Sequence, residues 1–274
     1  MLSPSNQFTG YIYGNEADQV AFAAASEPTL LTSITLPEEV DPTIWHLIED
    51  QLRQGSCQGN MLTTILEGCM YYDTGNNDPN FQLSRNAAYR FSQEEDGIRG
   101  DQGSTLEGGI AAARKGLPLA KYFPYTETYS SRIPEAARKN RDYKLVTANK
   151  LPKNNQPHEV AHNALGSRLY LIGLGMKWTN EMDSQSVIMR YTGRGSGGGH
   201  AVAIVGYKFI DGELYFWLAN SWGTRFWGQK GYKLVHYKAF DQIMAHGWNV
   251  GFTYSDLKDF DKPRYDFSTI TDIL

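Results

Sequence analysis

Cysteine is scarce in this chain: Cys57 and Cys69 are the only two in 274 residues. So few thiols exclude four-cysteine zinc sites and disulfide-rich scaffolds. If residues 57–71 form one helix, as argued below, the two sulfurs are about 18 Å apart along its axis. A disulfide needs Cα atoms within about 7 Å of each other. We therefore expect two free thiols, which suit a reducing compartment.

The chain also has no excess of basic charge. It contains 26 Lys and Arg and 30 Asp and Glu, which gives a net charge of −4. No basic stripe follows the sequence, which argues against nucleic acid as a main partner. No apolar run is long enough to cross a bilayer, so a membrane partner is not expected. The first residues lack a basic stretch followed by an apolar one, so we see no secretory signal and expect a cytoplasmic or virion-associated protein.

The strongest local pattern begins at Gly55 and Ser56. Apolar residues then recur at helical spacing and predict a buried helix over 57–71, with Ser56 as its N-cap and Cys57 in its first turn. Gly68 either ends this helix or lets it pack closely against a neighbour. Cys69 lies on the apolar stripe and is expected in the core.

The rest of the chain divides into a helix-rich first part and a strand-rich second part. Helices are predicted over 84–95, 105–115 (capped by Thr105) and 161–167, and strands over 168–177, 200–208, 213–220 and 231–236. This order predicts an α+β protein with two lobes. The expected division is an extension over 1–35, a helical lobe over 36–150, a β-rich lobe over 151–254 and a tail over 255–274. The tail is either solvated or a docking strap.

Cys57 is the main candidate for chemistry. A thiol in the first turn of a helix faces the positive end of the helix dipole, which favours the nucleophilic thiolate. Such a nucleophile needs a base, a group that orients the base, and an oxyanion donor. His200 follows a glycine-rich loop and opens an apolar strand, while Asn220 ends another strand. The sequence therefore offers a Cys, His and Asn set.

These residues stand in three motifs that resemble the papain-type cysteine peptidases: His200-Ala-Val-Ala-Ile-Val-Gly-Tyr207, Asn220-Ser-Trp-Gly223, and Trp227-Gly-Gln-Lys-Gly-Tyr232. The order Cys, His, Asn agrees, and the 143 residues from Cys57 to His200 match the family's spacing. The resemblance covers about residues 36–252. It implies a papain-like two-lobe fold, with a central nucleophile helix in the helical lobe and an antiparallel, barrel-like β lobe.

Two alignments of the nucleophile region compete. In the first, Gln54-Gly55-Ser56-Cys57 matches the family's Gln-Gly-x-Cys, which puts Asn60 at the nucleophile position and implies a dead relative. In the second, Gly55-Ser56-Cys57 matches Gly-Ser-Cys, and Gln51 falls where the family has its oxyanion-binding Gln. We favour the second, because the first would leave Cys57 wanting a disulfide partner that the chain lacks. The chain then resembles the bacterial and viral members without that disulfide.

The resemblance implies a role for each matched residue. Cys57 attacks a peptide carbonyl, His200 transfers the proton, Asn220 orients His200, and the Gln51 amide helps bind the oxyanion. Trp222 shields the His200–Asn220 hydrogen bond, and Gly103 pairs with the substrate backbone. The substrate is a peptide or protein, and neither a metal nor an organic cofactor is required.

Three functions remain as hypotheses. The first is an active papain-type endopeptidase working through an acyl-enzyme. The second is a catalytically idle structural or interaction protein, such as a phage-particle component, with an assembly partner that orders the polar termini. The third is a cell-wall peptidase, against which the Asn-Ser-Trp-Gly run and Gln51 argue.

Overall fold

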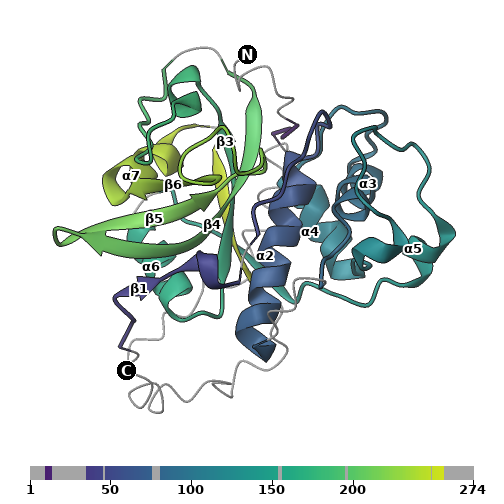
Figure 1. Cartoon of the computed structure of the whole chain (residues 1–274), viewed down its shortest axis with the longest axis horizontal. Coiled ribbons are helices and arrows are strands. Elements are labelled where there is room, and N and C mark those ends of the chain that lie inside the picture. The colour runs from purple at the N-terminus through teal and green to yellow at the C-terminus, as the bar shows by residue number, and fades with distance from the viewer. Residues whose placement is uncertain are drawn as a thin grey trace.

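The structure, a computed structural model, describes residues 10–13, 35–45, 47–75, 81–153, 156–194, 197–247 and 249–255. Helix α2 (Cys57–Thr74) lies in the middle of the molecule, with further helices on one side of it and an antiparallel sheet, accompanied by helices of its own, on the other (Figure 1). Most of the expected extension and all but the first residue of the expected tail lie outside the described residues.

Helix α2 is buried on most of its surface and packs against both halves of the molecule. It extends to Gly75, whose left-handed backbone (φ 68°) ends it. Gly68 therefore does not end the helix; it lets the helix approach its neighbours. A Cβ at Gly68 would lie 2.3 Å from Leu171 Cδ1 and 2.4 Å from Trp45 Cη2.

The helical half contains α3 (Arg85–Asp96), α4 (Leu106–Lys115) and the short α5 (Glu135–Lys139), together with the 3-10 turn η3 (Ala120–Tyr122). Side-chain caps start the two longer helices, because Ser84 Oγ accepts from Ala87 N at 3.0 Å and Thr105 Oγ1 from Gly108 N at 2.9 Å. The predicted Thr105 cap is confirmed. These caps satisfy backbone N–H groups that a helix start leaves without partners.

The described strands form one antiparallel sheet in the order β2-β7-β3-β4-β5-β6, with β1 also paired to β4. They are β1 (Glu39–Val40), β2 (Thr147–Lys150), β3 (Leu171–Lys177), β4 (Gly199–Ile210), β5 (Glu213–Ala219), β6 (Tyr232–His236) and β7 (Val250–Ser255). The four predicted strands are confirmed as β3 to β6. Strands β1, β2 and β7 were not predicted.

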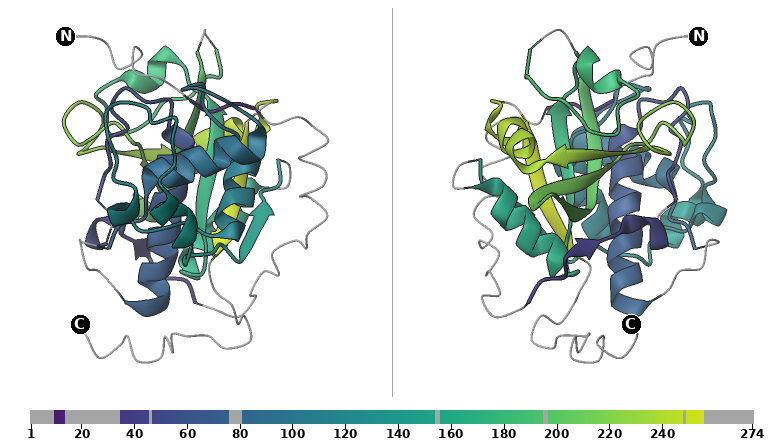
Figure 2. Two further views of the ribbon diagram at one scale, coloured as in Figure 1. Left: turned by 90° about the vertical axis from the view of Figure 1, so that its right-hand side faces the viewer. Right: turned by 60° about the vertical axis from the view of Figure 1, so that its left-hand side comes forward.

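The sheet lies between α2 on one side and α6 (Pro157–Gly166) and α7 (Tyr237–Ala245) on the other (Figure 2). The predicted helix over 161–167 corresponds to α6, which starts earlier, at Pro157, whereas α7 was not predicted. Two further 3-10 turns are η2 (Pro42–Ile44) and η4 (Asn180–Asp183). None of the described helices combines the length and the apolar character that crossing a membrane requires.

Candidate active site

Cys57 lies at the start of α2 and is fully buried. Its Sγ accepts hydrogen bonds from the backbone N–H of Ala201 at 3.4 Å and of Gly10 at 3.3 Å. Ala201 directly follows His200, so α2 and β4 bring Cys57 and His200 together from positions far apart in the sequence. Cys69 is also a free, buried thiol, and its Sγ contacts Tyr254 O at 3.4 Å, as expected of a core residue.

His200 and Asn220 are hydrogen-bonded, with His200 Nε2 2.7 Å from Asn220 Oδ1. The Asn220 oxygen also accepts from Ser221 N at 2.8 Å, which fixes which amide atom faces the ring. An amide oxygen only accepts, so Nε2 carries the proton of the neutral ring. His200 Nδ1 is buried and has no hydrogen-bond partner in the described chain. It is therefore the nitrogen left to exchange a proton with a nucleophile.

Two tryptophans enclose the His200 ring. Trp222 is tilted against it at a centroid distance of 4.9 Å, and Trp178 packs edge-on at 4.8 Å. Trp222 is buried beside the His200–Asn220 pair, where the sequence predicted a shield from water. Trp178 was missed by sequence reasoning. Its signal is the strand pairing: Met176 of β3 pairs with His200 of β4, which puts the end of β3 at the site.

Gln51 is fully buried and bound to the Asn220–Trp222 segment. Its backbone N donates to Ser221 O at 2.8 Å, and its Oε1 accepts from Ser221 Oγ at 2.7 Å. Its Nε2 donates to Gln54 O at 3.0 Å. The side chain is thus held in one orientation between the nucleophile helix and the segment that carries Asn220.

Asn60, which the competing alignment places at the nucleophile position, is bonded to residues other than His200. Its Nδ2 donates to Ser56 O at 2.9 Å, and its Oδ1 accepts from Arg85 at 3.1 Å. The geometry therefore supports the alignment that has Cys57 as nucleophile. One detail of that prediction is wrong, because the Ser56 side chain forms no cap bond to α2. The hydroxyl instead pairs with Tyr125 Oη at 2.5 Å, which draws it away from the helix N–H groups.

A segment from near the start of the chain, Gly10–Tyr13, lies across Cys57. Besides the bond from Gly10 N to Cys57 Sγ, Tyr11 N donates to Gly199 O at 3.2 Å, Ile12 N donates to Ser104 O at 3.0 Å, and Ser104 N donates to Gly10 O at 2.9 Å. The segment thus bridges the helical half and the β half directly over Cys57. Sequence reasoning left open whether residues 1–35 block the cleft, and this part of them covers the sulfur.

Gly103 lies beside this segment without bonding to it. Its N–H donates to Tyr89 Oη at 3.0 Å, and its backbone is left-handed with φ 89°. A Cβ at Gly103 would lie 2.0 Å from Gly10 O, so glycine makes room for a chain in the cleft. The neighbouring Ser104, which the motif did not single out, makes the backbone hydrogen bonds.

Burial governs the titration of Cys57 and His200. It raises the pKa of the Cys57 thiol to about 11, although the N–H groups of Ala201 and Gly10 lower it. Burial also lowers the pKa of His200 to about 4, against the effect of the Asn220 hydrogen bond. The helix position was expected to favour the thiolate; in this covered state loss of solvation outweighs that effect, and both groups are neutral.

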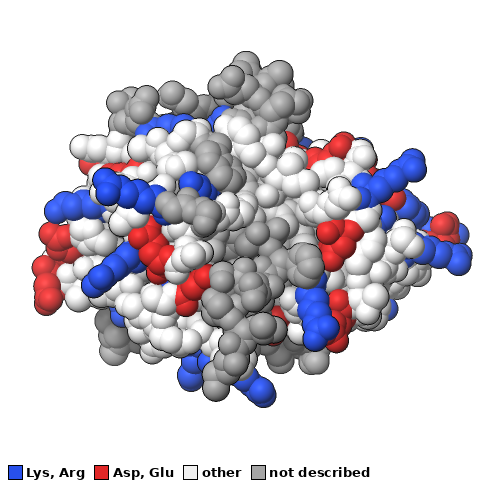
Figure 3. Space-filling model, turned by 90° about the horizontal axis from the view of Figure 1, so that it is seen from above, with Lys and Arg blue, Asp and Glu red and all other residues white. Residues whose placement is uncertain are grey.

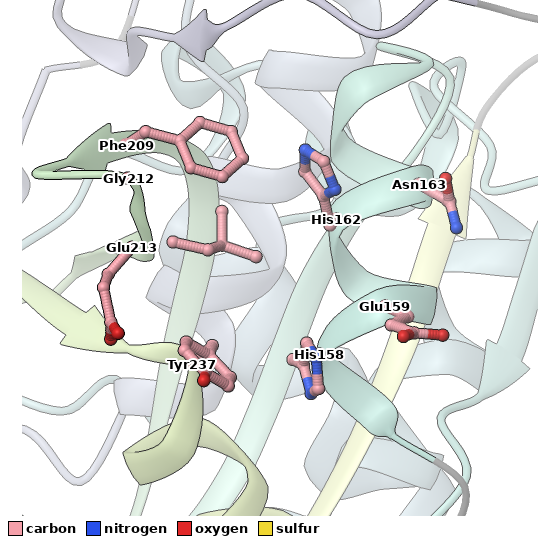
Figure 4. Close-up of a pocket in the computed structure, with 9 residues that line it drawn as sticks. His158, Glu159, His162, Asn163, Phe209, Gly212, Glu213 and Tyr237 are labelled. Carbon is pink, nitrogen blue, oxygen red and sulfur yellow. The ribbon is translucent and has the colours of Figure 1, made fainter.

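A separate hollow of about 440 Å³ lies on the other side of the sheet. His158 and His162 of α6 face Phe209, Glu213 and Tyr237 across it (Figure 4). It contains none of the predicted site residues. In the described chain, no group of three or more His, Cys, Asp or Glu has the arrangement of a metal site. On the face seen in Figure 3, Lys and Arg are interspersed with Asp and Glu.

Comparison with known sequences gives a family match and three partial relatives, two of which are described here. The sequence profile described as "Papain family cysteine protease" matches residues 36–246. Cysteine proteinase 2 of Entamoeba histolytica is 25% identical over 221 residues, covering 73% of this chain and 64% of that protein. Cysteine proteinase 1 of the same organism is 26% identical over 200 residues, covering 68% of this chain and 58% of that protein. The chain thus spans slightly less than two thirds of the length of these curated relatives.

Comparison with solved structures gives the same fold. Xylellain, a cysteine protease from Xylella fastidiosa, superposes with a TM-score of 0.73 at 22% identity, covering 94% of this chain and 99% of that one. Digestive procathepsin L 3 of the Tenebrio molitor larval midgut superposes with a TM-score of 0.66 at 17% identity, covering 90% of this chain and 83% of that one. At these identities the likeness shows the fold, and it confirms the predicted α+β architecture with two lobes.

Proposed function

Because the chain belongs to the papain family of cysteine proteases, we propose that it hydrolyses peptide bonds with Cys57 as nucleophile and His200 as the proton-transfer group. The observation that carries the proposal is the convergence of three elements. The thiol of Cys57 comes from the first residue of α2, the imidazole of His200 from the second residue of β4, and the amide of Asn220 from the residue after β5. All three meet at one place. This is the geometry that covalent catalysis by a thiol requires.

The steps follow from the atoms that are placed there. Cys57 Sγ transfers its proton to His200 Nδ1, and the thiolate attacks the peptide carbonyl carbon. His200 then gives that proton to the leaving amine, which breaks the C–N bond and leaves a thioester on Cys57. A water molecule gives a proton to His200 and attacks the thioester, which breaks the C–S bond and releases the acid. His200 then returns this proton to Cys57 Sγ. Asn220 holds the ring in position through Nε2, and Trp222 and Trp178 keep water from that bond.

The oxyanion formed during attack needs donors. We assign this role to the backbone N–H of Cys57, at the positive end of α2, and to the Gln51 side-chain amide. The support for Gln51 is its complete burial and its fixed orientation against Ser221. In the covered state its Nε2 is occupied by Gln54 O, so this bond has to be exchanged when substrate binds.

The enzyme must open before it can act. The segment Gly10–Tyr13 lies over the sulfur, and Gly10 N donates to it at 3.3 Å. When the segment leaves, water and substrate reach Cys57, and part of the burial that raises the thiol pKa is removed. The described structure therefore corresponds to a closed form of the peptidase.

Labelling with a peptidyl epoxide, which traps activated thiols, tests the proposal. Wild type, Cys57→Ala, His200→Ala and the control Cys69→Ala are incubated with the epoxide and analysed by mass spectrometry. Each is also prepared with Gly10→Ala, which displaces the covering segment, so that a closed cleft is not mistaken for an inactive one. In the Gly10→Ala background we expect one adduct in the otherwise wild-type protein and in Cys69→Ala, and none in Cys57→Ala or His200→Ala.

The other outcomes distinguish the competing functions. A folded, self-associating protein that is never labelled would support the idle structural protein. Release of peptides from purified peptidoglycan, with no cleavage of protein substrates, would support the cell-wall peptidase. Labelling of Cys57 that persists in His200→Ala would contradict the assigned role of His200.

A further inference from the structure

Lys233 of β6 is a lysine enclosed in the interior of the β half. Its exposed fraction is 0%, which makes it the least exposed Lys, Arg, Asp or Glu in the described chain. An ammonium is almost never fully buried unless its charge is paired, because leaving water is costly. Burial lowers the pKa of Lys233 to about 8 and the charge of Asp183 raises it, so the side chain is an ammonium at neutral pH. Its hydrogen-bond partners must therefore make up for the lost hydration.

The ammonium of Lys233 binds the end of the 3-10 turn η4. Its Nζ donates to Met182 O and to Ser184 O, both at 2.7 Å, and lies 3.3 Å from Ser184 Oγ. Three acceptors match the three protons of an ammonium. Nζ also lies 4.6 Å from the centroid of the Trp227 ring, whose Nε1 donates to Met182 O at 2.8 Å. Two buried side chains thus hold the same carbonyl.

These bonds lie on either side of Asp183, which stands between Met182 and Ser184 in the chain. Asp183 Oδ1 accepts a hydrogen bond from Trp178 Nε1 at 2.9 Å. Because Lys233 holds the carbonyls of both neighbours of Asp183, it restricts the backbone from which this carboxylate projects. The position of the Trp178 indole therefore depends on a cation that comes from a different strand.

Trp178 carries this restraint to His200. The two rings meet edge-on at a centroid distance of 4.8 Å, and Trp178 also contacts the Trp222 ring at 5.2 Å. The pKa of His200 is lowered by burial and raised by the Asn220 bond, with no contribution from the Lys233 charge. Lys233 therefore reaches the ring through packing and not through its charge.

From these contacts we propose that Lys233 is a positioning residue of the peptidase, which fixes the Trp178 indole against His200. It does so by holding both neighbours of Asp183. The proposal rests on the proposed peptidase function, and the alternative is that Lys233 contributes only to stability. Lys233→Met separates the two roles, because methionine fills nearly the same length without donating a hydrogen bond. Ser184 O then loses the lysine bond, and the indole is free to move.

The first test measures whether Lys233 holds Trp178, and it does not depend on activity. The indole N–H signal of Trp178 in the isotope-labelled full-length protein is assigned by its absence from Trp178→Phe. In Lys233→Met we expect this N–H to exchange with solvent deuterium at least about tenfold faster than in wild type, because its acceptor is no longer fixed. The indole N–H of Trp45, bonded to Tyr72 Oη of α2 at 3.1 Å, should be unchanged. The exposed Lys230→Met is the matched control.

The second test measures whether the restraint reaches the reaction. It is made in the Gly10→Ala background, and kcat is expressed per Cys57 thiol labelled by the epoxide, so that unfolded molecules are not counted. Lys233→Met should lower kcat at least about tenfold with KM little changed, because a displaced ring transfers its proton less well. Trp178→Phe removes the N–H that Asp183 binds and should lower kcat similarly. The double variant should lose no more than the stronger single variant, since both break one chain of contacts.

A pair of substitutions at Asp183 covers the case in which Lys233→Met does not fold. Asp183 is only partly buried, so its replacement is tolerated more easily. Asp183→Asn keeps an oxygen that can accept from Trp178, whereas Asp183→Leu has a similar size and no acceptor. We expect Asp183→Leu to reproduce the loss in kcat and the fast indole exchange, and Asp183→Asn to stay within about twofold of the unsubstituted protein.

The outcomes separate the two proposals. If no variant is labelled at Cys57 or cleaves a peptide, the proposed peptidase function is wrong, and the indole exchange alone decides whether Lys233 holds Trp178. If the protein is active, unchanged exchange of the Trp178 N–H in a folded Lys233→Met protein overturns the positioning role. A kcat loss in the double variant that equals the product of the two single losses would overturn it too, as would an equal loss in Asp183→Asn and Asp183→Leu.

Discussion

At the scale of single residues, burial keeps the His200 ring in its neutral form. The ring is enclosed by Trp178 and Trp222 and is fully buried, with one hydrogen bond to Asn220. Burial penalises the charged ring and lowers its pKa to about 4. The ring that becomes an imidazolium in the proposed mechanism is thus held neutral in the closed form.

The shifted pKa of His200 predicts how stability depends on pH. An unfolded chain takes up a proton on this residue below about pH 6.5, whereas the folded closed form does so only near pH 4. The contribution to stability is therefore present above pH 6.5 and is lost as the pH falls toward 4. Between pH 7 and 5 this residue should remove about 2 kcal/mol from the free energy of unfolding.

Urea unfolding of wild type and His200→Gln at pH 7 and pH 5 measures this effect. Other groups titrate over the same range, so the difference between the two proteins is the informative quantity. His200→Gln should lose about 2 kcal/mol less than wild type over this interval. An identical pH dependence in both would contradict the burial of a neutral ring.

The Asn220 amide provides a second test at this scale. Asn220→Ala removes the only hydrogen bond described for His200 Nε2 and frees the ring to turn. We expect kcat/KM to fall about tenfold or more with KM little changed, because ring orientation matters in the transition state. Asn163→Ala, in α6 and away from the site, should leave kinetics unchanged. A fall confined to KM would show that Asn220 acts on substrate binding instead.

At the scale of elements, the position of α2 against the sheet decides whether Cys57 meets β4. Gly68 brings the helix within contact of Leu171 and Trp45. Gly68→Val would force these groups apart and should destabilise the protein by about 2 kcal/mol or more, despite the better helix propensity of valine. Urea unfolding checks this against the exposed Gly247→Val control. A loss below about 0.5 kcal/mol would show that α2 can be displaced at little cost.

Which elements could be predicted depended on whether their signal is local. Helix α2 follows from its apolar spacing and α4 from the Thr105 cap, both contained within a few residues. Strand β2 is a short segment of mixed polarity that becomes a strand by pairing with β7, about a hundred residues later. Helix α7 follows β6 with no turn residue between them, so the sequence carries no signal that the strand ends and a helix begins.

The same distinction applies to the candidate site. Cys57, His200 and Asn220 stand in motifs and could be found without coordinates. Trp178 and Tyr11 stand in none, and Ser104 follows the matched Gly103 without being singled out itself. They reach the site by strand pairing or by a segment folding back, which are properties of the assembled chain. The Ser56 cap failed for a similar reason, since Tyr125, distant in sequence, takes its hydroxyl.

At the scale of the whole molecule, two glycines let the covering segment lie close to Cys57. A Cβ at Gly10 would lie 1.7 Å from Gly55 O, and one at Gly103 would lie 2.0 Å from Gly10 O. The segment therefore sits between the loop before α2 and the loop before α4. Since it also bonds to Gly199, it ties the two halves of the molecule together across the site.

Gly10→Ala should open the molecule. The added Cβ clashes with backbone, which cannot move aside as a flexible side chain could, so the segment has to leave the cleft. The clash falls on the segment, so the body should remain folded. Opening restores water to Cys57, which lowers the thiol pKa from about 11. We expect alkylation of Cys57 by iodoacetamide at pH 7 to become at least about tenfold faster, because the rate follows the thiolate fraction and access.

The pH at which the alkylation rate is half its maximum should also fall in Gly10→Ala. The control Gly247→Val should behave as wild type. Unchanged alkylation in a folded Gly10→Ala protein would show that the segment is not the barrier over the sulfur.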